Sequence, residues 1–122
     1  MNVLLDSSIL IDVIKKKVEL KEISYFVNPI VYAEILYGLL YIGKSEKQLQ
    51  KFLSEGGIEV LTIGLDTAGV YAKLKLDLNK KGRSLADNDL LIAASCLEHG
   101  LALYTSNSKH FARIPDLKLV GS

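Results

Sequence analysis

The stretch NVLLDSSILIDVI, residues 2–14, contains the pattern from which the fold is predicted. Residues 3–5 form a short apolar run, and the Asp-Ser-Ser triplet at 6–8 consists of good helix-capping residues. The apolar spacing of residues 9–14 then predicts a helix, which ends in the lysines 15–17, a favourable charge for a helix carboxyl end. The stretch therefore predicts a strand that leads directly into a helix.

The same alternation continues along the rest of the chain. Helix caps, glycines and changes of apolar periodicity mark the boundaries. Strands are predicted at residues 23–27, 58–62, 101–105 and 117–120, the last at an edge, and helices from Pro29 to Gly43, Ser45 to Gly56, Asp66 to Gly82 and about Leu85 to His99. Short apolar strands that alternate with helices predict an α/β fold, a three-layer α/β/α sandwich around a central, mainly parallel sheet.

Length and composition bound the class of protein. The chain has 122 residues, of which 49% are hydrophobic and 24% charged, so we expect one globular domain over residues 1–122. The net charge of +1 does not indicate nucleic-acid binding, and any basic surface must therefore be local. The single cysteine, Cys96, lies in an apolar run and is expected to be buried in a reducing compartment.

We expect no targeting segment and no membrane-spanning segment. The apolar start of the chain reaches Asp6 without a preceding basic region, unlike a signal peptide. The longest apolar stretch, residues 29–42, contains Glu34 and is too short to cross a bilayer. The sequence therefore predicts a cytoplasmic protein that does not bind a membrane.

Two acidic residues in the first third of the chain are candidates for a site. Asp6 directly follows the first strand, where parallel α/β sheets form their sites, although it can equally cap the next helix. Glu34 is the only charged residue of a helix that is apolar on nearly every side. We therefore expect Glu34 to be buried and to need a cation or several donors. The alternative is that its side chain reaches a lysine at the surface.

Two more acids, Asp87 and Asp89, lie at the start of another apolar helix. Acids in a first turn complement the helix dipole, and Asp87 can also form a capping box with Ser84.

Grouped carboxylates favour a bound metal ion. Two carboxylates about 4 Å apart repel by roughly 4 kcal/mol at an effective dielectric of about 20, and a divalent cation between them turns this repulsion into attraction. Carboxylates without His or Cys ligands suit Mg²⁺ or Mn²⁺ rather than Zn²⁺, and such an ion assists phosphodiester hydrolysis.

Four segments resemble the motifs of PIN domains, in particular those of VapC toxins from VapBC toxin–antitoxin pairs. They are Asp6-Ser7-Ser8 after the first strand, Tyr32 to Gly38 with the family's Ala-Glu-Leu-x-x-Gly pattern, Gly82 to Leu85 with Asp89 to Ala94, which resemble the Asp-x-x-Ile-Ala-Ala block, and Leu103 to Asn107 with His110-Phe111. Each motif is short, but the four occur in the family's order and span almost the whole chain.

The resemblance implies a PIN fold and an Mg²⁺- or Mn²⁺-dependent endoribonuclease that forms a homodimer and is silenced by a VapB-type antitoxin. Asp6, Glu34 and Asp89 match the family's first three metal-site acids. Ser7 matches a hydroxyl residue that supports the first of these acids. Asp87 is not at a motif position, so it is expected to be either an auxiliary metal ligand or a helix cap.

One position departs from the family pattern. The fourth acidic position falls on Asn107, where many relatives have Asp. An amide oxygen can coordinate an ion or hold a metal-bound water, but it adds no charge. The resemblance therefore implies one metal site and gives no support for a second. We expect Asn107 to orient water or substrate during catalysis.

Three other interpretations are open at the level of sequence. The first is a phospho-accepting receiver domain, which needs a pair of acids after its first strand. The second is a haloacid-dehalogenase-type phosphatase, which needs Asp-x-Asp at that place. This chain has Asp-Ser-Ser there, at residues 6–8. A catalytically weak or inactive PIN-like module that binds RNA or protein also fits, if activity was lost with the fourth acid. Such a module need not bind Mn²⁺, whereas the nuclease must.

Several other residues are candidates for weaker roles. Tyr32, Tyr37 and Tyr41 lie on one predicted helix and indicate either a dimer or antitoxin surface or core packing. Arg83 can contact RNA phosphates or be solvated, and His110 can assist proton transfer or be structural.

Overall fold

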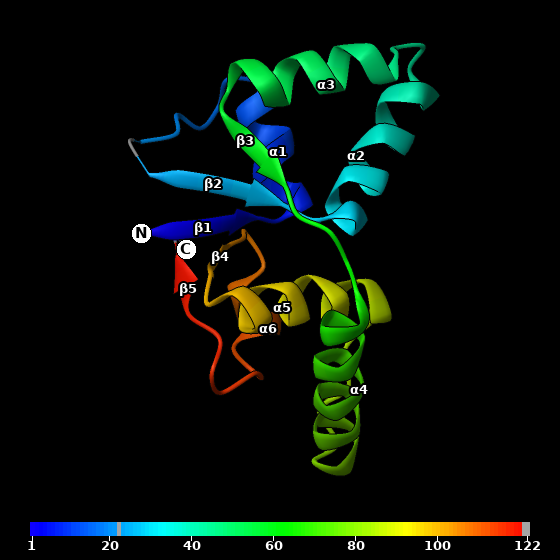
Figure 1. Cartoon of the computed structure of the whole chain (residues 1–122), viewed down its shortest axis with the longest axis vertical. Coiled ribbons are helices and arrows are strands. Elements are labelled where there is room, and N and C mark those ends of the chain that lie inside the picture. The colour runs from blue at the N-terminus through cyan, green and yellow to red at the C-terminus, as the bar shows by residue number, and fades with distance from the viewer. Residues whose placement is uncertain (22, 121–122) are drawn as a thin grey trace.

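Strand β1 (Asn2–Leu5) lies at the centre of the sheet in a computed structural model that describes residues 1–21 and 23–120 (Figure 1). The other strands in this part of the chain are β2 (Ser24–Val27), β3 (Ile58–Val60), β4 (Ala102–Tyr104) and β5 (Leu119–Val120). Its helices are α1 (Ser7–Ile14), α2 (Pro29–Tyr41), α3 (Glu46–Glu55), α4 (Leu65–Lys80), α5 (Asp87–His99) and α6 (Ser108–Phe111).

The strands form one sheet in the order β3-β2-β1-β4-β5, and every pair of neighbours is parallel. On β1, Leu4 lies opposite Phe26 of β2 on one side and opposite Leu103 of β4 on the other. A parallel connection needs a crossover, and here the crossovers contain the helices. The predicted α/β fold with a parallel sheet is confirmed.

The core forms where the helices pack on β1 and its neighbours. Leu4 and Leu5 of β1 and Ile92 of α5 are completely buried, as expected for a parallel sheet that is covered by helices. In Figure 1, helices α1, α2 and α3 lie near β2 and β3, whereas α5 and α6 lie near β4 and β5. Helix α4 extends away from the sheet and packs against α5.

Local capping signals determine where several helices begin. Asp6 caps α1, Asn28 caps α2 by accepting from the N–H of Val31 at 3.0 Å, and Ser45 forms the predicted capping box with Gln48 at α3. These caps satisfy backbone donors that a helix leaves unpaired. The predicted starts of these three helices are confirmed.

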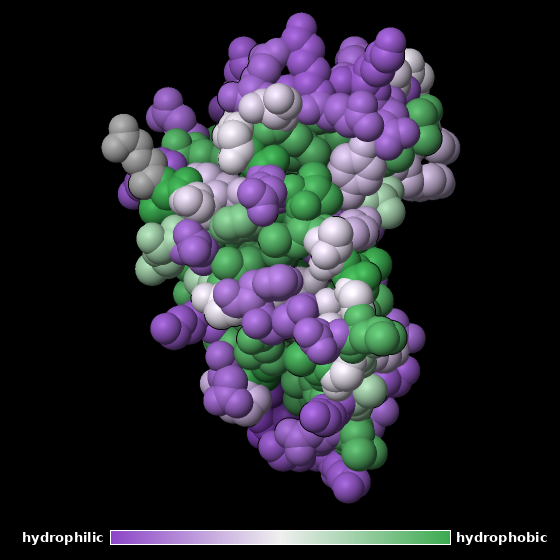
Figure 2. Space-filling view, viewed as in Figure 1, coloured by the Kyte–Doolittle hydropathy of each residue, from purple (hydrophilic) through white to green (hydrophobic). Residues whose placement is uncertain are grey.

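The predicted burial of α2 is wrong. Of its residues only Val31 and Ile35 are buried, whereas Tyr37, Leu40 and Tyr41 are 71%, 55% and 80% exposed. Ile30, Tyr32, Leu36 and Leu39 are partly buried against the core, so one side of the helix packs and the other is exposed. Figure 2 shows that α3 has a hydrophilic outer face, whereas hydrophobic residues reach the surface beside α2.

Three predicted details of the second half also differ. Gly64 rather than Asp66 is the cap of α4, because the hydroxyl of Thr67 accepts from the Gly64 N–H at 3.2 Å. Helix α5 begins at Asp87 and its cap residue is Ala86. Ser84 is therefore not at the cap position, and it cannot form a capping box with Asp87. The short helix α6 lies in a segment for which no helix or strand was predicted.

None of the helices in residues 1–21 and 23–120 has the length and apolar character needed to cross a membrane.

Candidate functional site

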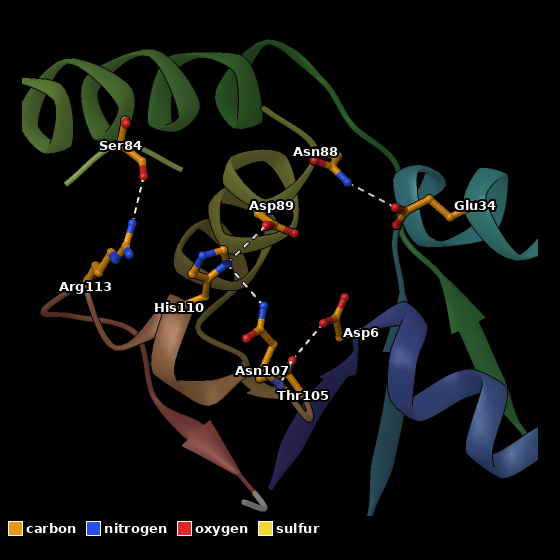
Figure 3. Close-up of polar contacts among 9 residues, drawn as sticks. All are labelled: Asp6, Glu34, Ser84, Asn88, Asp89, Thr105, Asn107, His110 and Arg113. Carbon is orange, nitrogen blue, oxygen red and sulfur yellow. Dashed lines mark hydrogen bonds and ion pairs between the residues drawn. The ribbon is translucent and has the colours of Figure 1, made fainter. Parts of the chain in front are cut away.

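Asp6 lies at the carboxyl end of the central strand. Because β1 and β4 are parallel neighbours, the residues that follow them, Asp6 and Thr105, meet at the same edge of the sheet. Asp6 is 8% exposed and Thr105 is fully buried. The Asp6 carboxylate accepts from the N–H of Ser7 at 2.8 Å through Oδ1 and from the Thr105 hydroxyl at 2.7 Å through Oδ2 (Figure 3). The side chain is therefore held in one orientation from two elements.

Glu34 approaches the same edge from α2, but it is exposed and not buried as predicted. Its Oε1 accepts from the Ser7 hydroxyl at 2.6 Å, and its Oε2 accepts from the Asn88 side-chain amide at 3.0 Å. Ser7 was expected to support Asp6, and it does so only through its backbone N–H. Its hydroxyl instead contacts Glu34, so this residue links the two acids.

Asp89 completes the group from the first turn of α5. Burial raises the pKa of the Asp89 carboxyl above its ordinary value, and the negative charges of Asp6 and, more weakly, Glu34 raise it further, while His110 opposes the shift. Asp6 and Glu34 are therefore close enough to act electrostatically on Asp89. In Figure 3 the carboxylates of Asp6, Glu34 and Asp89 face a common space. The structure thus brings together the three acids that the sequence indicated.

Asn107 lies on the β4 side of this group. Its backbone N–H donates to the Thr105 hydroxyl at 3.0 Å, and its side-chain nitrogen lies 3.1 Å from Nδ1 of His110. The same His110 nitrogen is 4.0 Å from Oδ2 of Asp89. Asn107 is therefore an exposed, uncharged polar group that is linked to Asp6 through Thr105 and to Asp89 through His110.

Asp87 makes its contacts with α4 instead of the acid group. Its carboxylate accepts from the Lys75 ammonium at 2.9 Å and from the Tyr71 hydroxyl at 2.8 Å. The hydrogen bond from Lys75, followed by that from Tyr71, lowers the pKa of Asp87. Asp87 therefore joins the start of α5 to α4, although it is only two residues from Asp89.

Two functional neighbours were missed by the sequence analysis. Thr105 supports Asp6, and Asn88 contacts Glu34. Thr105 lies inside the segment of residues 103–107 that resembles the family, and this was the only sequence signal for it. Asn88 lies between two acids, and nothing in its local sequence indicates a partner on α2.

The donor set of this edge is oxygen. Within residues 1–21 and 23–120, no group of three Asp, Glu, His or Cys side chains is close enough to hold a metal ion as the side chains stand. The arrangement can offer carboxylate oxygens to a hard cation from three elements.

Comparison with known proteins identifies the family. The model of the PIN domain family matches residues 3–117. The chain is 30% identical to Ribonuclease VapC1 of Rickettsia felis over 98% of this chain and 96% of that protein, and 30% identical to Ribonuclease VapC2 of Haemophilus influenzae over 94% and 93%.

Solved structures agree with this relationship. A chain of VapBC2 from Rickettsia felis, bound to a DNA fragment from its promoter, superposes with a TM-score of 0.85 at 30% identity, covering 98% of each chain. A chain of VapBC-1 from nontypeable Haemophilus influenzae gives a TM-score of 0.82 at 28% identity, covering 98% of this chain and 97% of that one. The resemblance noted in the sequence is confirmed, and the receiver and phosphatase interpretations are excluded. The chain belongs to the PIN domain family, among its VapC proteins.

Proposed function

We propose that the protein is a metal-dependent endoribonuclease that hydrolyses RNA phosphodiester bonds and forms the toxin of a toxin–antitoxin pair. The observation that carries this proposal is the group of three carboxylates, Asp6, Glu34 and Asp89, at the carboxyl edge of the sheet. The proposal is supported by relatives named Ribonuclease VapC that align over nearly the whole chain.

The residues present fit a divalent cation of the Mg²⁺ or Mn²⁺ type. Burial is the main cause of the raised pKa of Asp89, and the negative charges of Asp6 and Glu34 raise it further. A divalent cation would remove this repulsion, and Mg²⁺ and Mn²⁺ prefer oxygen ligands. Asp6, Glu34 and Asp89 would hold the ion once their side chains move closer together than they stand here.

In such a site the chain's own residues have separate tasks. A bound ion would polarise the phosphoryl group and lower the pKa of a water molecule. Thr105 and the Ser7 N–H hold Asp6, while the Ser7 hydroxyl and Asn88 hold Glu34. Asn107, as an uncharged neighbour of the acids, would orient water or substrate. Asp87 is occupied by Lys75, and its role as an auxiliary ligand has no support from these contacts.

The exposed apolar surface beside α2 supports the proposed protein partners. It includes Tyr37, Leu40 and Tyr41, and Leu39 of the same helix lines a groove of about 410 Å³ together with Ile11 of α1. Exposed apolar patches of this kind mark protein interfaces. The solved relatives are VapBC complexes. We infer that a VapB-type antitoxin and a second copy of the chain bind this protein, and that the pair acts in the cytoplasm.

The test is Mn²⁺-dependent cleavage of a long structured RNA by purified protein, with Asp6→Asn and Glu34→Gln prepared in parallel. Asp66→Asn is a matched control, because Asp66 is an exposed acid on α4. Cleavage that EDTA and both site substitutions abolish, but the control retains, would support the nuclease. A folded protein that binds no Mn²⁺ and cleaves none of a range of RNAs would favour the inactive binding module.

A further inference from the structure

The carboxylate of Glu34 is unusually well held for an exposed side chain. Glu34 is exposed on α2, and its long side chain loses considerable conformational entropy when it is fixed. Both of its oxygens nevertheless accept hydrogen bonds from other elements, Oε1 from Ser7 of α1 at 2.6 Å and Oε2 from Asn88 of α5 at 3.0 Å. Two donors from opposite sides restrict the position of the carboxylate.

Asn88 is not required to hold α2 against α5. That contact is already made by Asn28, which is fully buried at the start of α2. Its side-chain amide donates to the Leu91 carbonyl at 3.3 Å and to the Ser95 hydroxyl at 3.0 Å, both on α5. A buried bridge contributes more to stability than an exposed one, because water competes for the exposed groups. The Asn88 contact therefore needs another explanation.

The charge of the two donors supplies that explanation. Ser7 and Asn88 are neutral, so they orient the Glu34 carboxylate without neutralising it. A lysine or arginine in the same place would compete with a cation for the carboxylate. Asn88 also directly precedes Asp89 in the first turn of α5, and it thus couples the position of Glu34 to that of Asp89.

We infer that Asn88 is a positioning residue that keeps the Glu34 carboxylate near Asp89, so that both side chains can move onto the same divalent cation. This inference rests on the proposed metal-dependent function. Hydrogen-bonding partners of metal ligands contribute about 10–100-fold to metal affinity. The exposed Asn88–Glu34 contact should lie near the lower end, at about 10-fold.

The test is the Mn²⁺ affinity of the full chain, measured by isothermal titration calorimetry, for the parent protein, Asn88→Ala and Asn88→Gln. Asn79→Ala is the matched control, because Asn79 is an exposed asparagine in the last turns of α4. We expect about a 10-fold weaker Mn²⁺ affinity for Asn88→Ala, a smaller loss for Asn88→Gln, which keeps an amide donor, and no change for the control. The melting temperature of metal-free Asn88→Ala should equal that of the parent.

RNA cleavage by the same proteins separates the two proposals. For Asn88→Ala, the Mn²⁺ concentration needed for half-maximal cleavage should rise by the same factor, while the rate at saturating Mn²⁺ stays close to that of the parent. An unchanged Mn²⁺ affinity in Asn88→Ala, or an equal loss in Asn79→Ala, would overturn the role of Asn88 and leave the nuclease intact. A parent protein that neither binds Mn²⁺ nor cleaves RNA would overturn both.

Discussion

Replacing Thr105 by valine tests whether the Asp6 carboxylate depends on a buried hydroxyl. Valine has nearly the same shape as threonine, so the substitution removes the hydroxyl and leaves the packing almost unchanged. The Thr105 hydroxyl donates to Asp6 Oδ2 at 2.7 Å and accepts from the Asn107 N–H at 3.0 Å. Thr105 is fully buried and Asp6 is 8% exposed, so water cannot readily replace the lost donor.

The size of the effect follows from these two hydrogen bonds. A hydrogen bond to a charged group contributes about 1.5–3 kcal/mol, and a neutral one about 1 kcal/mol. Thr105→Val should therefore lower the free energy of unfolding by roughly 2–4 kcal/mol. With an unfolding entropy of about 2.1 cal/mol/K per residue, a chain of 122 residues loses about 4 °C in melting temperature per kcal/mol. The expected loss is about 8–16 °C.

The assay is thermal unfolding at pH 7 in the presence of EDTA, followed by circular dichroism. Thr105→Ser is the matched control, because it keeps the hydroxyl and removes only one methyl group, at a cost of about 1 kcal/mol or 4 °C. Mn²⁺ affinity should fall in Thr105→Val, since Asp6 loses its orientation. A valine variant as stable as the serine variant would refute the reasoning, because losing the hydroxyl would then cost no more than losing one methyl group.

Three further predictions concern the acids of α5 and the exposed face of α2. Asp89→Asn should raise the melting temperature of the metal-free protein at pH 7 by about 2 °C, the repulsion being partly screened by solvent. The raised pKa of Asp89 means that the folded state holds the proton more tightly than the unfolded state, so the stability of the parent falls as pH rises through that folded pKa. The advantage of Asp89→Asn should therefore vanish below about pH 3, where both states are protonated, and a pH-independent difference between the melting curves would contradict this origin. Asp87→Ala should leave Mn²⁺ affinity and RNA cleavage within about 2-fold of the parent, as expected for an exposed ion pair with Lys75; a loss as large as that of Asp89→Asn would make Asp87 a ligand. Tyr41→Ser should leave the melting temperature unchanged, because Tyr41 is 80% exposed. It should weaken antitoxin binding, measured by calorimetry, by about 10-fold or more. Unchanged antitoxin binding would show that this surface is not part of the interface.

The parts of the fold that the sequence predicted are those governed by neighbouring residues. Asp6, Asn28 and Ser45 cap the helices that follow them, because each cap contacts a backbone N–H no more than three residues away. The short apolar strands are likewise a local signal, since parallel strands covered on both faces need continuous apolar runs. Such features do not depend on where the rest of the chain lies.

The burial of α2 was predicted wrongly because hydropathy does not distinguish a core from an interface. Leu40 and Tyr41 are as apolar as core residues, but they lie at the surface. Helix α6 has only four residues, too few for any periodicity. The contacts of Asn88 with Glu34 and of Thr105 with Asp6 join residues 54 and 99 positions apart, and no neighbouring residue indicates either contact.

The charge of its hydrogen-bond donors distinguishes an acid with a structural role from a candidate metal ligand in this protein. The position of the acid in the sequence does so less clearly. Asp87 and Asp89 are two residues apart in one helix turn, and the helix-dipole argument applies to both. Asp87 has an ammonium partner, Lys75, which already balances its charge. Asp6 and Glu34 have only neutral donors in the hydrogen bonds described above, from Ser7, Asn88 and Thr105, and His110 stays 4.0 Å from Asp89. Neutral donors fix a carboxylate and leave its charge available, which is what the proposed binding of a divalent cation requires.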